Sequence, residues 1–265
     1  MKNGALSKLY ILGILLFLYT PIFVLMLMSF NESRYNTLPF VFSLKWYEAL
    51  KDNTTLMTAM NNSLYIAFVT GICCVILGTL FVLGSQVISG KWKGLFSSMM
   101  VMPLSIPWLI MGLSLLLMIR AFQMDKNMFF VFAGHIIISL PYSVLVLQAR
   151  IQALDSALDE ASASLGANAL TTFRRITLPM LAPAMVAGGF LSFMMSFDNF
   201  VISYFLIPAG ITTLPIEIQS SIKFGFTPEI NAVSTLIIGI SLVCLAVVGA
   251  IMGSSLKSIF NGGKA

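Results

Sequence analysis

One acidic side chain stands inside a long, otherwise uncharged stretch of this sequence. Asp198 is the single charged residue between Arg175 and Glu217. A carboxylate near the middle of a membrane costs roughly 2.5–3.5 kcal/mol on insertion scales, so such residues usually face a bundle interior or an aqueous path. In that position it could receive the ammonium group of an amine substrate. The alternative is a carboxylate that reaches the outer interface or pairs with Arg120 or Lys126.

Polar residues recur near Asp198 at helical spacing. Ser192, Ser196, Asn199 and Ser203 follow one another at intervals of four, three and four, which places them on one face of a helix. Such a stripe either lines a path for a polar solute or joins helices by hydrogen bonds, and spacing alone does not separate the two. Ser196 and Asn199, together with Asp198, are the candidate substrate-path residues of this stretch.

Two tryptophans and one histidine complete the set of residues that could meet a solute. Trp108 could stack on a cation, although it also suits simple packing. Trp46 lies in the polar segment 31–62, where it either anchors at the membrane interface or reaches a channel mouth. His135, alone in an apolar run, is better explained as a hydrogen-bond partner between helices than as a ligand.

Motifs for catalysis and for metal binding are missing from the sequence. The three cysteines all fall inside apolar runs, and no group of residues has metal-ligand spacing. The sequence also contains no Walker A glycine loop and no nucleophile motif. We therefore expect no catalytic residue, no metal site and no ATP-hydrolysing site in this chain.

The elements that must position these residues are membrane helices. The chain is 58% hydrophobic and only 9% charged, with a mean hydropathy of +0.95, whereas soluble domains carry about 25% charged residues. A helix needs roughly 20 apolar residues to cross a bilayer, and continuous apolar runs of that length exclude the short alternating strands of a membrane barrel. We expect an all-α integral membrane protein, a single transmembrane domain over residues 1–265. The six expected spans lie near residues 9–30, 64–88, 95–119, 127–148, 181–206 and 233–254.

Two of these spans carry further expectations. The first exceeds the roughly 7–15 residues of a signal-peptide apolar core, so we expect it to remain as an anchor. Pro103 and Pro107 are expected to kink the third, because each removes a backbone donor.

The distribution of charge predicts the orientation. Six spans put both termini on one side of the membrane, and that side carries nine of the fifteen Lys and Arg residues but only three acids. The other side carries six Lys and Arg residues and six acids. Because cytoplasmic loops are enriched in Lys and Arg, both termini and the loop 149–180 are expected in the cytoplasm. The net charge of +5 then reflects membrane orientation, and no nucleic-acid partner is expected.

The cytoplasmic loop 149–180 is expected to form two short helices. Apolar residues recur at intervals of four, three and four from Leu154 to Leu165, with Ser156 as a plausible N-cap and Gly166 as the stop. Asn168 then caps a second helix.

The second helix is expected to run through Ile176. Pro179 is expected to prevent its extension into the next span. The result is a bent element beneath the membrane that either inserts into a partner's groove or merely lies on the headgroups.

The same loop resembles the one by which permeases of bacterial ATP-binding-cassette (ABC) importers hold their ATPase. That family's loop reads E-A-A, three residues, Gly, nine residues and I-x-L-P. The matching residues here are Glu160, Ala161, Ser162, Gly166, Ile176, Leu178 and Pro179, with Ser162 in place of the second alanine. The resemblance implies the type I ABC importer permease fold, with this loop as the coupling element.

Most of the chain resembles the second permease subunit of spermidine/putrescine importers. The matching pieces include S-F-N-E-S-R at 29–34, N-S-L at 62–64, L-S-F-M-M-S-F-D-N at 191–199 and T-L-P at 213–215. This resemblance implies a bacterial inner-membrane complex with a second homologous permease, an extracytoplasmic substrate-binding protein and two ATPase subunits that bind ATP and Mg. ATP hydrolysis would belong to those partners, and this chain itself would be no enzyme.

The chain departs from the polyamine pattern at two acidic positions. The polyamine permeases usually carry Asp-Asp where this chain has Asp198-Asn199, and often an acid where it has Trp108. A diamine, a monoamine or an amino acid would need fewer anions than a polycation. The expected substrate is a polyamine or related small amine, and the alternatives are an amino acid or an aminophosphonate.

Two other classes of protein stay in view. A transporter driven by protons or sodium should show an inverted repeat and paired broken helices, and the sequence shows neither. A membrane scaffold without a transport role is the third class.

Overall fold

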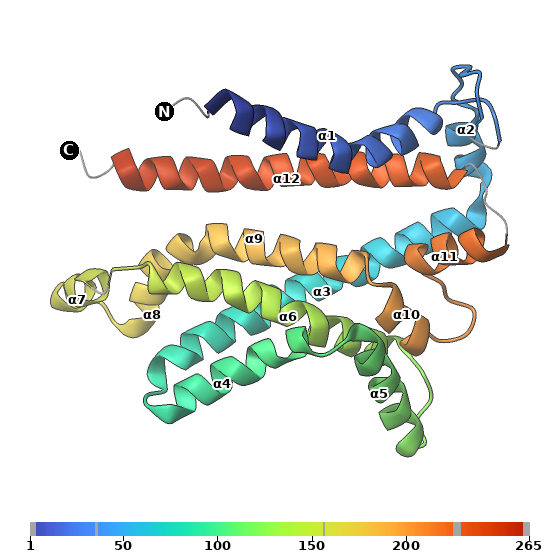
Figure 1. Cartoon of the computed structure of the whole chain (residues 1–265). Coiled ribbons are helices and arrows are strands. Elements are labelled where there is room, and N and C mark those ends of the chain that lie inside the picture. Colours follow the sequence, from blue (N-terminus) through green and yellow to red (C-terminus); the bar gives the residue numbers. More distant parts are fainter. Residues whose placement is uncertain (1–3, 35–36, 156, 225–228, 262–265) are drawn as a thin grey trace. The chain divides into compact units, whose positions relative to one another are not determined.

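The computed structural model describes residues 4–34, 37–155, 157–224 and 229–261 (Figure 1). These described residues form helices and, apart from one isolated bridge between Asn31 and Phe42, no β-structure. The helices in chain order are α1 (Gly4–Met28), α2 (Lys45–Asp52), α3 (Thr54–Val87), α4 (Lys91–Val101), the 3₁₀ turn η1 (Met102–Ser105), α5 (Trp108–Ala121), α6 (Met128–Gln152), α7 (Ala157–Ser164), α8 (Ala169–Thr172), the π-helical turn η2 (Phe173–Thr177), α9 (Leu178–Phe197), α10 (Phe200–Leu206), α11 (Leu214–Phe224) and α12 (Glu229–Asn261).

The chain divides into two compact units, which are described separately. The first unit combines residues 1–58 with 217–245, and the second combines 59–216 with 246–265. The second unit holds the stretch around Asp198 and the loop 149–180, which we name the coupling loop for the role that the resemblance implies.

Four helical segments are long and apolar enough to cross a membrane. They are Leu6–Met28, Thr54–Val87, Met128–Gln152 and Ala169–Phe197. The bent pair Lys91–Ser105 and Trp108–Ala121 gives a fifth when counted as one span. The described apolar part of α12, Glu229–Val243, is shorter. Five of the six expected spans therefore have a counterpart of sufficient length, and the sixth stays a prediction.

The third expected span, 95–119, is not one continuous helix. Its two parts meet at an angle of 102° after η1. Ile106 is extended (φ −92°, ψ 127°) because it precedes Pro107, and a residue before proline is pushed out of the helical region. The expected kink is confirmed, but the two prolines break the span rather than bend it.

The fifth expected span, 181–206, is also interrupted. Helix α9 ends at Phe197, Asn199 is extended (φ −79°, ψ 99°) and α10 begins at Phe200. The side-chain Oδ1 of Asn199 accepts a hydrogen bond from the Ile202 amide at 2.8 Å, so Asn199 caps the new helix. Asp198 therefore lies at a break between two helices.

Pro179 does not stop the second loop helix, contrary to the sequence-based expectation. Helical structure runs without interruption from Ala169 to Phe197. The turn η2 directly precedes Pro179 and follows a π-helical pattern, in which hydrogen bonds join residues five apart. Proline has no amide N–H to donate, and in a regular α-helix its ring clashes with the carbonyl four residues back. The wider π-helical turn accommodates Pro179 at the start of α9. The coupling loop is thus continuous with α9.

Small residues allow α3, α6 and α9 to approach closely within the second unit. A Cβ atom added to Gly188 on α9 would lie 3.0 Å from Ser143 Oγ on α6. A Cβ atom on Gly78 of α3 would lie 3.1 Å from the same oxygen. Figure 1 shows α6 and α9 running side by side over most of their length. Close packing of small residues is the usual basis of helix association in membranes.

Candidate functional site

The coupling loop forms a bent pair of short helices, α7 and α8. The expected N-cap Ser156 lies outside the described residues, and Asp155 Oδ1 accepts a hydrogen bond from the Ala157 amide at 2.9 Å. Helix α7 ends at Ser164, and Gly166, two residues later, has a φ of +81°. The Gly166 amide donates to the Ala163 carbonyl (2.9 Å), and the next amide along the chain bonds back to the last turn of α7. This αL glycine arrangement confirms Gly166 as the predicted helix stop.

Helix α8 is tied to α7 by a pair of hydroxyl groups. Asn168 Oδ1 accepts from the Thr171 amide at 2.8 Å, which confirms Asn168 as the cap of the second helix. The Oγ of Ser162 lies 2.7 Å from Thr172 Oγ1, and Ser162 is buried. Ser162 is the one departure from the E-A-A pattern, so in this chain the substituted residue supplies a bond that holds the bend closed.

The first motif residues of the bend lie largely on its outer surface. Glu160, Ala161 and Gly166 are exposed. Leu165 is 88% exposed and Leu170 is 56% exposed, so the apolar residues of this segment are not covered by the described chain. Exposed apolar side chains beside an acid form a surface suited to protein contact. The last three motif residues, Ile176, Leu178 and Pro179, lie in η2 and at the start of α9.

The bond between Ser162 and Thr172 should affect coupling. One hydrogen bond contributes about 1 kcal/mol net, so we expect Ser162→Ala and Thr172→Val each to lower partner-coupled ATP hydrolysis about two- to fivefold. The double variant should be no worse than either single variant, because both remove the same bond. Rates of ATP hydrolysis by the assembled complex measure this. Independent, multiplicative losses in the double variant would contradict it.

Asp198 and Asn199 occupy the break between α9 and α10 in different environments. Asp198 is exposed, and among the described residues no ion pair joins it to Arg120 or Lys126. Asn199 is only 1% exposed, and its Nδ2 has no hydrogen-bond partner within the described part of the chain. The arrangement leaves one carboxylate available to a solute at a point where backbone helix bonding is interrupted.

The polar stripe faces α6 and joins the two helices of the broken span to it. His135 Nδ1 lies 2.8 Å from Ser196 Oγ, and His135 Nε2 lies 3.0 Å from Ser203 Oγ. Ser192 Oγ donates to the Ser139 carbonyl at 3.0 Å. His135 therefore spans the break from α9 to α10, as expected of a histidine that bonds helices together. Ser196 is buried in this contact, and its part in a substrate path stays a prediction.

The two candidate tryptophans differ in exposure. Trp108 is the first residue of α5, directly after the break that follows η1, and is 40% exposed. Trp46, in the first unit, is 8% exposed, and its Nε1 donates to the Asn31 carbonyl at 2.7 Å. Lys45 Nζ lies 5.0 Å from the centre of the Trp46 ring, a cation–π contact. In the first unit Trp46 thus holds its own segment together, whereas Trp108 is available at the surface of the second unit.

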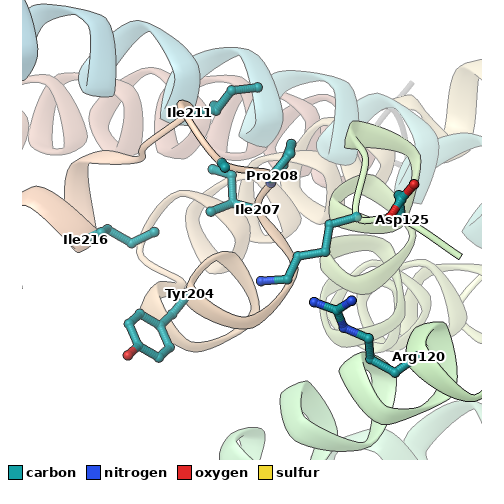
Figure 2. A pocket seen from close by; sticks show the side chains of 9 residues that line it. Arg120, Asp125, Tyr204, Ile207, Pro208, Ile211 and Ile216 are labelled. Atoms are coloured by element: carbon teal, nitrogen blue, oxygen red, sulfur yellow. The ribbon is translucent and has the colours of Figure 1, made fainter. Parts of the chain in front are cut away.

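The second unit contains a pocket that the sequence did not predict. It has a volume of about 590 Å³ and lies where the α5–α6 connection meets the segment after α10 (Figure 2). Its lining residues are Arg120, Asp125, Lys126, Tyr204, Ile207, Pro208, Ala209, Ile211 and Ile216. The charges near residues 120–126 were visible in the sequence, but the second wall comes from residues about eighty positions later.

Comparison with known proteins assigns the chain to a family. Residues 76–258 match the family model described as "Binding-protein-dependent transport system inner membrane component". This chain belongs to that family. The assignment confirms the predicted resemblance. The chain is a permease subunit of an ABC importer and is not itself an enzyme.

Individual relatives agree with this family. The chain is 38% identical to the putrescine transport system permease protein PotI of Escherichia coli (strain K12), over 84% of this chain and 82% of that protein. It is 34% identical to the spermidine/putrescine transport system permease protein PotC of Haemophilus influenzae, over 91% of this chain and 94% of that protein.

A solved structure supports the fold. A bacterial alginate ABC transporter, determined in complex with a periplasmic protein bound to an alginate pentasaccharide, has a chain that matches with a TM-score of 0.66. The match covers 94% of this chain and 93% of that chain at 16% sequence identity. The all-helical membrane fold of a type I ABC importer permease is thereby confirmed, although the count of six spans is not.

Proposed function

We propose that this permease carries a polyamine or a related small amine inward across a bacterial inner membrane, with both termini in the cytoplasm. The observation that carries the proposal is the exposed bend from Glu160 to Gly166, within a chain of the binding-protein-dependent family. The partners are two ATPase subunits that bind ATP and Mg, a second homologous permease subunit and an extracytoplasmic substrate-binding protein.

Continuity between the coupling loop and α9 supports a mechanical role for the bend. The helical path from Ala169 ends at Phe197, immediately before Asp198. Arg150, in the last turn of α6, donates from Nε to the Met180 carbonyl at 2.9 Å and ties α6 to the start of α9. A displacement of the bend by the ATPase pair would therefore move α9 as a rigid rod. The end of that rod is the break that carries the candidate substrate carboxylate.

The proposed substrate follows from charge and from the relatives. Asp198 offers one carboxylate to an ammonium group, and Trp108 offers an exposed ring in the same unit. The two relatives are by name putrescine and spermidine/putrescine permeases. Because this chain has Asn199 in place of a second acid, a diamine or another amine of low charge fits better than a polycation. An amino acid or an aminophosphonate is the alternative within the same family.

Broken helices also occur in secondary transporters, which are driven by ion gradients. The sequence showed no such break, but the structure has two, after η1 and at Asp198. Family membership favours the ATP-driven mechanism.

The energy source is tested by uptake of radiolabelled putrescine into cells that depend on this system. Depletion of ATP should stop uptake, and an uncoupler that spares ATP should not. Uptake that survives ATP depletion and stops with the uncoupler would contradict the proposal.

A further inference from the structure

The pocket beside the α5–α6 connection has an unusual balance of charge for a transporter of amines. Arg120 and Lys126 supply two positive charges, and Asp125 supplies one negative charge. In Figure 2 the Arg120 guanidinium points into the pocket, and the Asp125 carboxylate points away from it. Among the described residues, neither cation has an ion-pair partner. Two unpaired cations in one pocket attract an anionic group and repel a polyamine.

One wall of the pocket, formed by the segment after α10, is held in place by residues of α3. Asn62 Nδ2 donates to the Thr212 carbonyl at 2.9 Å. The Leu214 amide donates to Ser63 Oγ at 2.8 Å. Both bonds fix the segment that carries the apolar lining, so the pocket is a built feature of the second unit and not the gap beside a free loop.

The pocket also lies at the junction of the two broken spans. Arg120 is in the last turn of α5, and Tyr204 is on α10. A Cβ atom on Gly112 of α5 would lie 2.8 Å from Phe205 Cδ2 of α10, so the two helices are in close contact. An occupant that bonds to Arg120 and rests against Tyr204 would fasten α5 to α10, next to the break at Asp198.

We propose that this pocket receives an acidic side chain, flanked by apolar residues, from the extracytoplasmic substrate-binding protein. The inference rests on the proposed function, whose topology places residues 120–127 and 207–213 outside the membrane. A carboxylate between Arg120 and Lys126 relieves the repulsion of the two cations, and the apolar lining suits the residues around the acid. Docking of the binding protein would in this way fix α5 against α10 before the substrate is released.

The association rate of the binding protein tests this proposal. The complete transporter is reconstituted in nanodiscs of neutral lipid, and its cognate substrate-binding protein is passed over the surface. We expect Arg120→Gln with Lys126→Gln to slow association about tenfold at low salt, with the difference shrinking at high salt. Asp125→Asn should change the rate in the opposite direction, about two- to threefold faster, because it removes the opposing charge.

The matched control is Lys51→Gln, which neutralises an exposed cation on the same predicted side but outside the pocket. It should leave the association rate unchanged. Equal slowing by Lys51→Gln would show a general charge effect and would overturn the proposal.

Further arms of the experiment separate other occupants. Docking that is normal in the double variant, with a loss of activity only when anionic lipid is left out, would assign the pocket to a lipid headgroup. Normal docking with a changed KM for the transported solute would assign it to the substrate. Either result overturns the proposal. If the unmodified transporter does not bind the protein at all, the proposed function itself has failed.

A charge exchange gives the decisive positive result. Arg120→Glu should weaken docking, and changing the matching acid of the binding protein to lysine should restore most of it. Failure of every acid-to-lysine change on the docking face to restore Arg120→Glu would count against a direct carboxylate contact.

Discussion

Replacing Gly166 with valine is expected to reduce ATP hydrolysis stimulated by the binding protein at least tenfold. Gly166 has a φ of +81°, a backbone conformation that costs residues with a Cβ about 1–2 kcal/mol, and β-branched residues most of all. Crowding is not the reason, because no atom lies within 4 Å of an added Cβ. The substitution changes the angle between α7 and α8, and the ATPase pair would then meet a misplaced surface.

Gly166→Asn is the matched variant for this prediction. Asparagine adopts positive φ far more readily than valine, so it should keep most of the stimulated hydrolysis. Membrane insertion and assembly, measured by co-purification with the partner subunits, should be normal in both variants. Equal activity of the valine and asparagine variants would show that the backbone conformation at Gly166 is not what matters.

Asp198→Asn is expected to lower the transport rate at least tenfold while leaving the docking of the binding protein unchanged. The carboxylate is exposed at the break between α9 and α10, where it can meet an ammonium group. A charge-assisted hydrogen bond contributes about 1.5–3 kcal/mol, which corresponds to a change of this size. Initial rates of putrescine uptake into proteoliposomes give the measurement, with docking followed separately.

Two further variants show whether the charge itself is required. Asp198→Glu keeps the charge and should retain a larger share of transport than Asp198→Asn. Asp52→Asn makes the same chemical change at an exposed acid in α2 and should have no effect. If Asp198→Asn transports at the normal rate, Asp198 does not belong to the substrate path.

Local chemistry explains why the coupling bend was predictable. The stop at Gly166 and the cap at Asn168 are set by backbone preferences of single residues, and both are confirmed. Pro179 shows the limit of such local rules. A proline alone predicts the end of a helix, but the π-helical turn η2 before it lets the helix continue.

The arrangement around Asp198 depends on contacts that spacing cannot show. No glycine or proline between residues 190 and 207 marks the break after Phe197, although Asn199 is a residue type that often caps a helix. Spacing left open whether the polar stripe faces a path or a neighbouring helix, and it could not show that His135 bonds to two of its serines. The charged pocket joins segments far apart in sequence, so its two walls could not be paired without the fold.

Solute accumulation in proteoliposomes distinguishes a permease driven by partner ATPases from a transporter that works alone. One preparation contains this chain alone, and the other contains the full complex with its ATPase pair, sister permease and binding protein. We expect labelled putrescine to accumulate only with the full complex, and only with ATP on the side of the coupling bend. Accumulation by this chain alone, driven by an ion gradient, would contradict it.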